Sequence, residues 1–236
     1  MKYEKIGIIA AIDKEIDGLV ANMKNVRTET YSGRKYYIGN IGNKTVVAAK
    51  SGIGKVFAAT CAQTMILKYE PDCIINIGIA GGLDERLKIL DIVVATKVVQ
   101  HDMNLISGGA PGRGYLQFDD GEVLFMDCDE TLCKKITDAA TSLGINNISG
   151  TVASGDIFVA DINVKNKIKN EFGASACEME GGAIGQTCFM AKTPFCVLRA
   201  ISDGGDDAAA MEYPMFAAAA ADRSIKVIMK FLENDN

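Results

Sequence analysis

The feature that most constrains the fold is a set of short runs that are hydrophobic at nearly every position. Residues 5–11, 73–79 and 194–201 place Ile, Val, Leu, Phe or Ala at both the odd and the even positions of a strand. Strands of this kind are buried on both faces, which is typical of a sheet covered by helices on both sides. The pattern therefore predicts an α/β fold, a three-layer α/β/α domain with a mixed central sheet.

Longer segments with helical spacing alternate with these runs, and most glycines fall between them. Strands are expected at 5–11, 35–39, 44–50, 73–79, 89–99, 148–153 and 194–201, with a further short strand just before the EMEGG segment. Helices are expected at 14–23, 54–69, 129–143, 162–172, 179–190 and about 214–232. Residues 106–120, which contain SGGAPGRG, have no apolar periodicity and predict a long surface loop. A chain of 236 residues fits one domain, 1–236.

Charge and hydropathy exclude several kinds of partner. The 25 basic and 30 acidic residues give a formal charge of -5, which disfavours binding to the phosphate backbone of a nucleic acid. The first apolar run is followed at once by Asp13, Lys14 and Glu15, which favours a buried strand over a signal peptide. No apolar stretch approaches the roughly 20 residues of a membrane-spanning helix. We therefore expect a soluble, cytoplasmic protein.

The cysteines and the lone histidine argue against a metal site. The seven cysteines form no CxxC pair and lie in apolar segments, which predicts reduced core residues. With His101 as the single histidine, the usual zinc ligand sets cannot be assembled. A magnesium site made only of carboxylates has no support in the sequence. We expect no metal and no cofactor.

Polar residues and glycines follow several of the apolar runs, where ligands collect in open α/β sheets. The first run ends in Asp13 and Glu15, which are candidates for catalysis but equally for acids that stabilise a helix N-terminus. SGIGK at 51–55 and NIGIAGGL at 76–83 are not phosphate loops of the GxxxxGK type, and their glycines could serve only tight turns.

Two acidic segments are more suggestive. In CEMEGGA, Glu178 and Glu180 flank Met179 where an apolar strand gives way to a helix, and two carboxylates there are costly if buried without partners. The alternative is that both acids are solvated at the helix start. In LRAISD, Arg199 and Asp203 lie on or just after a strongly apolar strand, and Asp203 could instead cap a following turn.

Together and in this order, the segments resemble the methylthioadenosine/S-adenosylhomocysteine nucleosidases, within the wider purine nucleoside phosphorylase superfamily. The resemblance covers nearly the whole chain. It rests on GIIAAIDKEI, KSGIGKVFAA, NIGIAGGL, DIVV with a following HD, SGDIF, EMEGGAIG and RAISD. It implies a metal-independent enzyme that hydrolyses an adenine nucleoside, and it implies a homodimer.

The resemblance also implies roles for matching positions. Glu15 would activate the attacking water, Asp203 would protonate the five-membered ring of the departing purine, and Glu180 would hold the ribose hydroxyls. Charge develops on both sides of an N-glycosidic bond as it breaks, so an acid at the base and a carboxylate at the water suit this chemistry. For Asp203 to donate a proton near neutral pH, its pKa must be raised. The other substrate-binding positions implied are Met179, Phe158, Val159, Ala80, Gly81, Arg199, Ser202, Glu178, Ile53 and Tyr213.

Some of these positions carry a more specific expectation. Met179 would pack against the ribose, Phe158 would stack on the adenine, and the main chain around Val159 would read the edge of the base. Arg199 would support the hydroxyl or water end of the site. Tyr213 would face the 5′ tail of the nucleoside.

The chain departs from the family pattern in two places. Gly108, Gly109 and Ala110 stand in the loop where the family carries aromatic residues that cross a dimer interface and cover the alkylthio tail, so a wider tail pocket is expected. Gly181 and Gly182 stand where alanines are more usual, at a cost of about 1 kcal/mol of helix propensity each.

Three alternatives remain open. A phosphate-dependent nucleoside phosphorylase shares the fold, but the charge of Glu15 at the water site would repel phosphate. A hydrolase of futalosine-type nucleosides or of 5′-deoxyadenosine fits the altered loop. A non-catalytic nucleoside sensor is of another class, and it would not need the water-activating acid. His101 and Asp102 have no nucleophile in an elbow motif, so we assign them a structural role.

Overall fold

The computed structural model describes residues 3–234, so the first two and last two residues of the predicted domain lie outside the described part. The helices are α1 (Asp13–Ala21), α2 (Lys55–Tyr69), α3 (Glu130–Ser142), α4 (Ile162–Phe172), α5 (Gly181–Ala191) and α6 (Ala209–Asn234), with a short 3-10 helix at Ile106–Gly108. The strands are β1 (Lys5–Ala10), β2 (Lys24–Tyr31), β3 (Arg34–Ile41), β4 (Lys44–Lys50), β5 (Cys73–Gly82), β6 (Ile92–Gln100), β7 (Leu116–Phe118), β8 (Gly121–Val123), β9 (Met126–Asp127), β10 (Asn147–Ser154), β11 (Ala174–Glu178) and β12 (Phe195–Asp203).

The central sheet is mixed, as predicted, with the order β11-β10-β6-β12-β5-β1-β4-β3-β2. Strands β4, β1, β5 and β12 run parallel to one another, whereas β12 pairs antiparallel with β6. The sheet also curves until β11 pairs with β5, through Ala176 with Gly82 and Cys177 with Gly81. Strands β5, β12, β6, β10 and β11 thus form a closed ring, which brings the end of β11 to the ends of β5 and β12.

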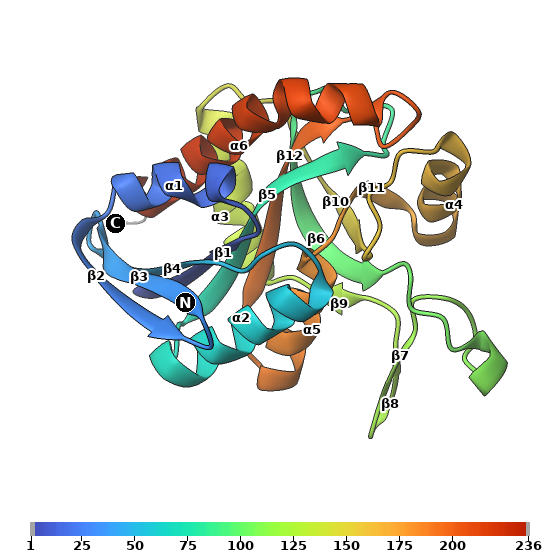
Figure 1. Ribbon diagram of the computed structural model, residues 1–236, viewed down its shortest axis with the longest axis horizontal. Coiled ribbons are helices and arrows are strands. Elements are labelled where there is room, and N and C mark those ends of the chain that lie inside the picture. The colour runs from blue at the N-terminus through green and yellow to red at the C-terminus, as the bar shows by residue number, and fades with distance from the viewer. Residues whose placement is uncertain (1–2, 235–236) are drawn as a thin grey trace.

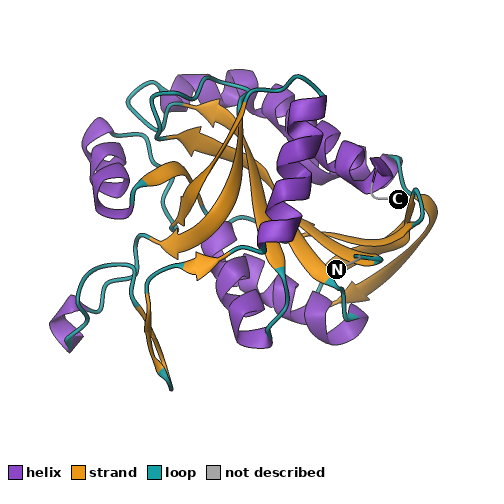
Figure 2. Ribbon diagram, turned by 180° about the vertical axis from the view of Figure 1, so that it is seen from behind, coloured by secondary structure: helices purple, strands orange, loops and turns teal. Residues whose placement is uncertain are grey.

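Helices cover the sheet on both faces (Figures 1 and 2). Helix α6 packs on α1, α3 and β12, whereas α2 and α5 pack on each other on the opposite face. All ten residues of β5 are buried, which explains its largely apolar sequence. Burial of each Ile, Val or Leu side chain in this core contributes about 1.5 to 3 kcal/mol. The predicted three-layer α/β/α domain is confirmed.

At three places the elements differ from the expectations or add to them. Strand β2 was not expected, because KNVRTETY has no apolar run; it is an edge strand that forms by antiparallel pairing with β3. The expected surface loop at 106–120 contains a 3-10 helix and the start of a hairpin, β7 and β8, which projects from the body (Figure 1). Helix α6 begins at Ala209, not at Pro214, so the proline lies within its early turns.

Within residues 3–234, no helix combines the length and the apolar character that crossing a bilayer requires.

Candidate active site

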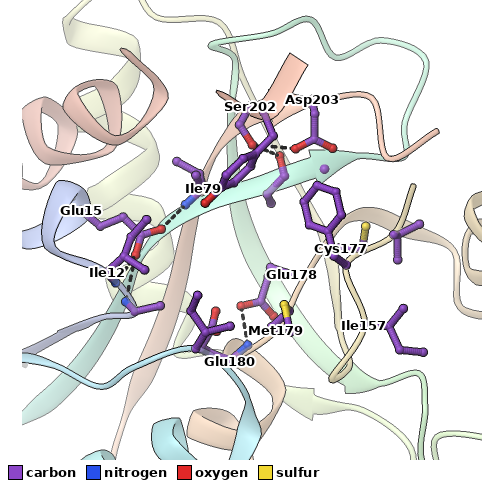
Figure 3. A pocket seen from close by; sticks show the side chains of 17 residues that line it. Ile12, Glu15, Ile79, Ile157, Cys177, Glu178, Met179, Glu180, Ser202 and Asp203 are labelled. Atoms are coloured by element: carbon purple, nitrogen blue, oxygen red, sulfur yellow. Dashed lines mark hydrogen bonds between the residues drawn. The ribbon is translucent and has the colours of Figure 1, made fainter. Parts of the chain in front are cut away.

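A cavity of about 360 Å³ lies where β1, β5 and β12 end, beside the end of β11 (Figure 3). Its walls bring together segments that are far apart in the sequence. It is lined by Ala11, Ile12, Glu15, Ile53, Ile79, Ala80, Gly81, Ile157, Phe158, Val159, Cys177, Glu178, Met179, Glu180, Ser202, Asp203 and Tyr213. The topology alone accounts for this meeting, since ligand sites in open α/β sheets form at the carboxyl ends of strands.

Glu15 projects from the first turn of α1 to one side of the cavity (Figure 3). Its Oε2 accepts hydrogen bonds from the backbone N–H groups of Ala11 (2.9 Å) and Ile12 (3.0 Å), and its Oε1 accepts one from Ile79 (3.0 Å). Burial raises the pKa of Glu15, although Arg199 and the three backbone donors act in the opposite direction. Glu15 is therefore both the helix-terminal acid and a candidate general base.

The room for Glu15 depends on a glycine of β5. A Cβ atom at Gly78 would lie 2.6 Å from Glu15 Oε1 and 3.1 Å from a terminal nitrogen of Arg199. Any side chain at this position would push the carboxylate out of place. The glycine of NIGIAGGL at this position thus serves the close approach of Glu15, and not only a turn.

Asp203 ends β12 on another wall of the cavity, away from Glu15 (Figure 3). Its Oδ2 accepts a hydrogen bond from the Ser202 hydroxyl (2.8 Å) and its Oδ1 accepts one from the Gly205 N–H (2.9 Å). Burial raises the pKa of Asp203 against the effect of these two bonds. A raised pKa is what a carboxylic acid needs to deliver a proton near neutral pH.

Glu178 and Glu180 flank Met179 but have different environments. Glu178 accepts hydrogen bonds from the Ser154 hydroxyl, from Arg199 and from the Gly181 N–H. Burial alone would raise the pKa of Glu178, but Arg199 and these donors hold it below its usual value. Glu180 accepts a bond from the Gly54 N–H (2.9 Å) and lies 3.7 Å from Arg199. Burial and the charge of Glu178 raise the pKa of Glu180 to about 8.

The raised pKa of Glu180 should make the stability of the fold depend on pH. The unfolded chain releases this proton from about pH 4.5, whereas the folded chain holds it to about pH 8. Ionisation therefore favours unfolding increasingly between these two pH values. We expect Glu180→Gln to reduce the loss of thermal stability between pH 5 and pH 8 by about 10 °C.

Thermal unfolding of wild type and variant at several pH values measures this. The same substitution at the exposed Glu122 of the hairpin should leave the pH profile as in wild type. If Glu180→Gln follows the wild-type profile, the carboxyl group of Glu180 does not hold a proton in the folded protein.

Arg199 is not in the cavity wall. It is buried behind Glu178, where it also donates to the side chain of Asn76 (2.5 Å). The structure therefore places Arg199 behind the cavity wall, where its Nη2 donates to Glu178 and Asn76, and its expected contact with substrate stays a prediction. The positive charge of Arg199 acts on three glutamates of the wall. It lowers the pKa of Glu178 and opposes the rise in the pKa of Glu15 and Glu180.

Apolar side chains form the rest of the wall. Phe158 and Tyr213 pack edge to face with ring centroids 5.5 Å apart, and Phe158 is still 48% exposed. Ile53, from the segment before α2, is 53% exposed at the cavity. An exposed aromatic surface beside a cavity offers a face on which a planar base can stack.

The structure brings every predicted site residue except Arg199 to one cavity. Sequence reasoning missed Ala11, Ile12, Ile79, Ile157 and Cys177 as wall residues. Their apolar side chains carry no signal that separates wall residues from core residues, so only the folded structure shows them at the cavity. Burial raises the pKa of the Cys177 thiol to about 12, and a thiol that keeps its proton is a poor nucleophile.

Close packing accounts for the two glycines that begin α5. A Cβ atom at Gly181 would lie 3.1 Å from Glu178 Oε1, and one at Gly182 would lie 3.0 Å from Ser154. The Gly182 N–H also donates to the Ser154 hydroxyl (2.6 Å). Glycine lets the helix start close to Glu178 of β11 at the first position and close to Ser154 of β10 at the second.

Fold and site together define an α/β enzyme with buried acids on separate walls of one small-molecule cavity. A family model described as the phosphorylase superfamily matches residues 5–233. A relative from Shewanella loihica, named 5′-methylthioadenosine/S-adenosylhomocysteine nucleosidase, is 35% identical over 98% of this chain and 99% of its own length. The chain belongs to the methylthioadenosine/S-adenosylhomocysteine nucleosidase family of the phosphorylase superfamily.

Solved structures agree with this assignment. A Neisseria meningitidis nucleosidase of the same name, in complex with methylthio-immucillin-A, aligns with a TM-score of 0.92 at 33% identity and covers 98% of this chain and 99% of that one. The futalosine hydrolase of Helicobacter pylori also aligns with a TM-score of 0.92, at 32% identity over 98% of both chains.

Proposed function

We propose that the chain hydrolyses the N-glycosidic bond of adenine nucleosides that carry a 5′ thioether, releasing adenine and the 5-substituted ribose. The observation that carries this proposal is the placement of two buried acids, Glu15 and Asp203, on different walls of one cavity. Breaking this bond leaves positive charge on the sugar and negative charge on the base. An acid on the purine side can protonate the departing base, and a carboxylate on the sugar side can take a proton from the attacking water.

Asp203 is proposed as the proton donor to the purine. The proton moves from the Asp203 carboxyl to the five-membered ring as the bonding electrons leave with the base. Glu15 takes a proton from the water that adds to the sugar carbon. Both acids have raised pKa values, and Glu15 has a fixed orientation because three backbone N–H groups hold its oxygens.

Glu180 is proposed to bind the ribose hydroxyls, with Met179 packed against the sugar. Phe158 is proposed to stack on the adenine and the main chain at Val159 to contact its edge, while Tyr213 faces the 5′ tail. Glu178, bonded by Arg199, supports Glu180 from behind. Contacts to the ribose that strengthen as the ring flattens would accelerate the chemical step.

Hydrolysis is favoured over phosphorolysis by the charge of the wall. Among the described residues that line the cavity there is no Lys, Arg or His, while four are acidic. A phosphate ion would meet like charge at Glu15 without a cation in the wall to offset it. Arg199 lies behind this wall, where its Nη2 donates to Glu178 and Asn76 and its Nη1 donates to the Leu198 carbonyl.

A futalosine-type nucleoside is the second candidate substrate, because the futalosine hydrolase aligns as well as the nucleosidase does. 5′-Deoxyadenosine is a third. Adenine release in phosphate-free buffer from methylthioadenosine, S-adenosylhomocysteine and 5′-deoxyadenosine, with base release from futalosine and inosine, ranks them. We expect the two thioethers to have the highest kcat/KM. Base release only from futalosine would instead indicate a futalosine hydrolase. Adenine binding without any turnover would indicate a nucleoside sensor.

We also propose that the protein is a homodimer in the reducing cytoplasm. Val56 and Phe57 of α2 and Met190 of α5 are 75%, 58% and 65% exposed on two helices that pack together, which gives an apolar area for a second copy to cover. The seven cysteines are free and buried, as in proteins from a reducing compartment. Light scattering of the purified protein measures the oligomeric state, and a monomer would contradict the proposal.

A further inference from the structure

His101 and Asp102 follow β6 and do not line the cavity, so the proposed reaction leaves them without a role. Asp102 nevertheless lies at the centre of a closed set of polar contacts. Its Oδ1 accepts a hydrogen bond from Lys55 Nζ (2.6 Å) and its Oδ2 accepts one from the Asp156 N–H (2.9 Å). The Asp156 side chain in turn accepts a bond from the Lys55 N–H (2.8 Å). We call Lys55, Asp102 and Asp156 the clasp.

Each end of the clasp is directly connected to a wall of the cavity. On one side, Gly54 precedes Lys55, and its N–H donates to Glu180 (2.9 Å). On the other side, Asp156 begins the segment that carries Phe158 and Val159. The clasp thus joins the segment that holds the proposed ribose-binding carboxylate to the segment that carries the proposed adenine-stacking ring.

Gly54 and Gly155 allow the two segments to approach each other. Gly54 has φ +99°, and a Cβ there would lie 3.0 Å from the Asp156 carboxylate. A Cβ at Gly155 would lie 2.4 Å from His101 Nε2, so only a glycine lets the backbone pass over this buried ring. His101 therefore supports the turn from which the Asp156 N–H reaches Asp102.

The clasp is also shielded from water more than a typical surface ion pair. The side chains of Lys55 and Asp102 are 18% and 19% exposed. Burial alone would raise the pKa of Asp102, but Lys55 and the Asp156 N–H hold it below its usual value. The folded structure therefore favours the charged form of Asp102 that both contacts need. By contrast, Lys134 and Asp138 of α3 form a pair at 2.8 Å with side chains 74% and 63% exposed.

We infer that Asp102 is a positioning residue for the proposed reaction. Through Lys55 and Asp156 it sets the distance between the segment that bonds Glu180, at the ribose, and the segment that carries Phe158, at the adenine. The inference rests on the proposed function for its effect on catalysis. Glu15 and Asp203 are held by other groups, namely Ile79, Ser202 and Gly205, so their chemistry does not depend on the clasp.

Asp102→Asn tests the inference. Asn has one acceptor oxygen, and its amide would meet either Lys55 Nζ or the Asp156 N–H as donor against donor. We expect KM for methylthioadenosine to rise about tenfold with kcat within about threefold of wild type, because the walls and not the reacting acids are displaced. Lys55→Met should act alike, and the double variant should be no worse than either single one.

The exposed pair supplies the matched control. Asp138→Asn also removes a Lys–Asp pair and should leave KM unchanged. If Asp102→Asn acted only by unfolding part of the protein, the active fraction and hence kcat would fall while KM stayed constant. That result, or wild-type KM in Asp102→Asn, would overturn the inference.

Amide hydrogen exchange tests the clasp without relying on the proposed reaction. The amides of Gly54, Lys55 and Asp156 donate within this network, and we expect them to exchange about tenfold faster in Asp102→Asn and as in wild type in Asp138→Asn. Unchanged exchange at all three would refute the clasp itself. A wild-type protein that releases no adenine would refute the proposed function and leave this readout valid.

Discussion

Asp203→Asn is expected to lower kcat for methylthioadenosine about a thousandfold with little change in KM. Asn has nearly the same shape and can still accept the bond from the Gly205 N–H, but it cannot deliver a proton to the purine. Because burial raises the pKa of Asp203, the neutral amide should not destabilise the fold near neutral pH. Adenine release under saturating substrate, together with thermal unfolding, measures both effects.

The pH profile gives a second check on Asp203. A general acid must be protonated, so wild-type activity should fall as pH rises through the raised pKa of this carboxyl group. The residual activity of Asp203→Asn should lack that alkaline fall. Asp206→Asn, three residues on, removes an acid that is bonded to Lys165 and should keep kcat within about threefold of wild type. Near wild-type kcat in Asp203→Asn would remove Asp203 from the role of proton donor.

Glu15→Gln is expected to have a comparable effect, a fall in kcat of about a thousandfold, because the neutral amide cannot take the proton from water. Binding of a nucleoside should persist, since Glu180 and Phe158 belong to other segments of the wall. Calorimetric titration with methylthioadenosine should therefore show binding without turnover.

Asp13→Asn is the matched control for Glu15. Asp13 lies in the same first turn of α1, but its side chain is exposed and forms an ion pair with Lys50 (2.6 Å). We expect kcat within about threefold of wild type. If Asp13→Asn and Glu15→Gln lose the same activity, the effect comes from the helix N-terminus and not from a base at the water.

Much of the fold follows from local patterns. The ten residues of β5 and the nine of β12 are buried throughout, and their largely apolar sequences predict this except at Asn76, Arg199, Ser202 and Asp203. The antiparallel contact between Cys177 and Gly81 joins residues distant in the chain, and nothing in either segment indicates it. The same holds for β2, where pairing with β3 and not burial decides the structure.

The acidic residues of the site could be found from sequence, but their partners could not. Glu178 and Glu180 stand two residues apart in an identical kind of context, yet Arg199 lowers the pKa of one while burial raises that of the other. The difference arises because Arg199 reaches Glu178 across the sheet. The sequence likewise shows Asp102 only as an acidic residue after a strand. Its contacts could not be predicted, because Lys55 and Asp156 lie 47 and 54 residues away in the chain.

The central claim is that water, and not phosphate, accepts the ribosyl group. Purified wild-type protein mixed with methylthioadenosine in phosphate-free buffer should release adenine and methylthioribose in equal amounts, and added phosphate should change neither the rate nor the sugar product. Adenine release that requires phosphate and yields a sugar phosphate would contradict the account.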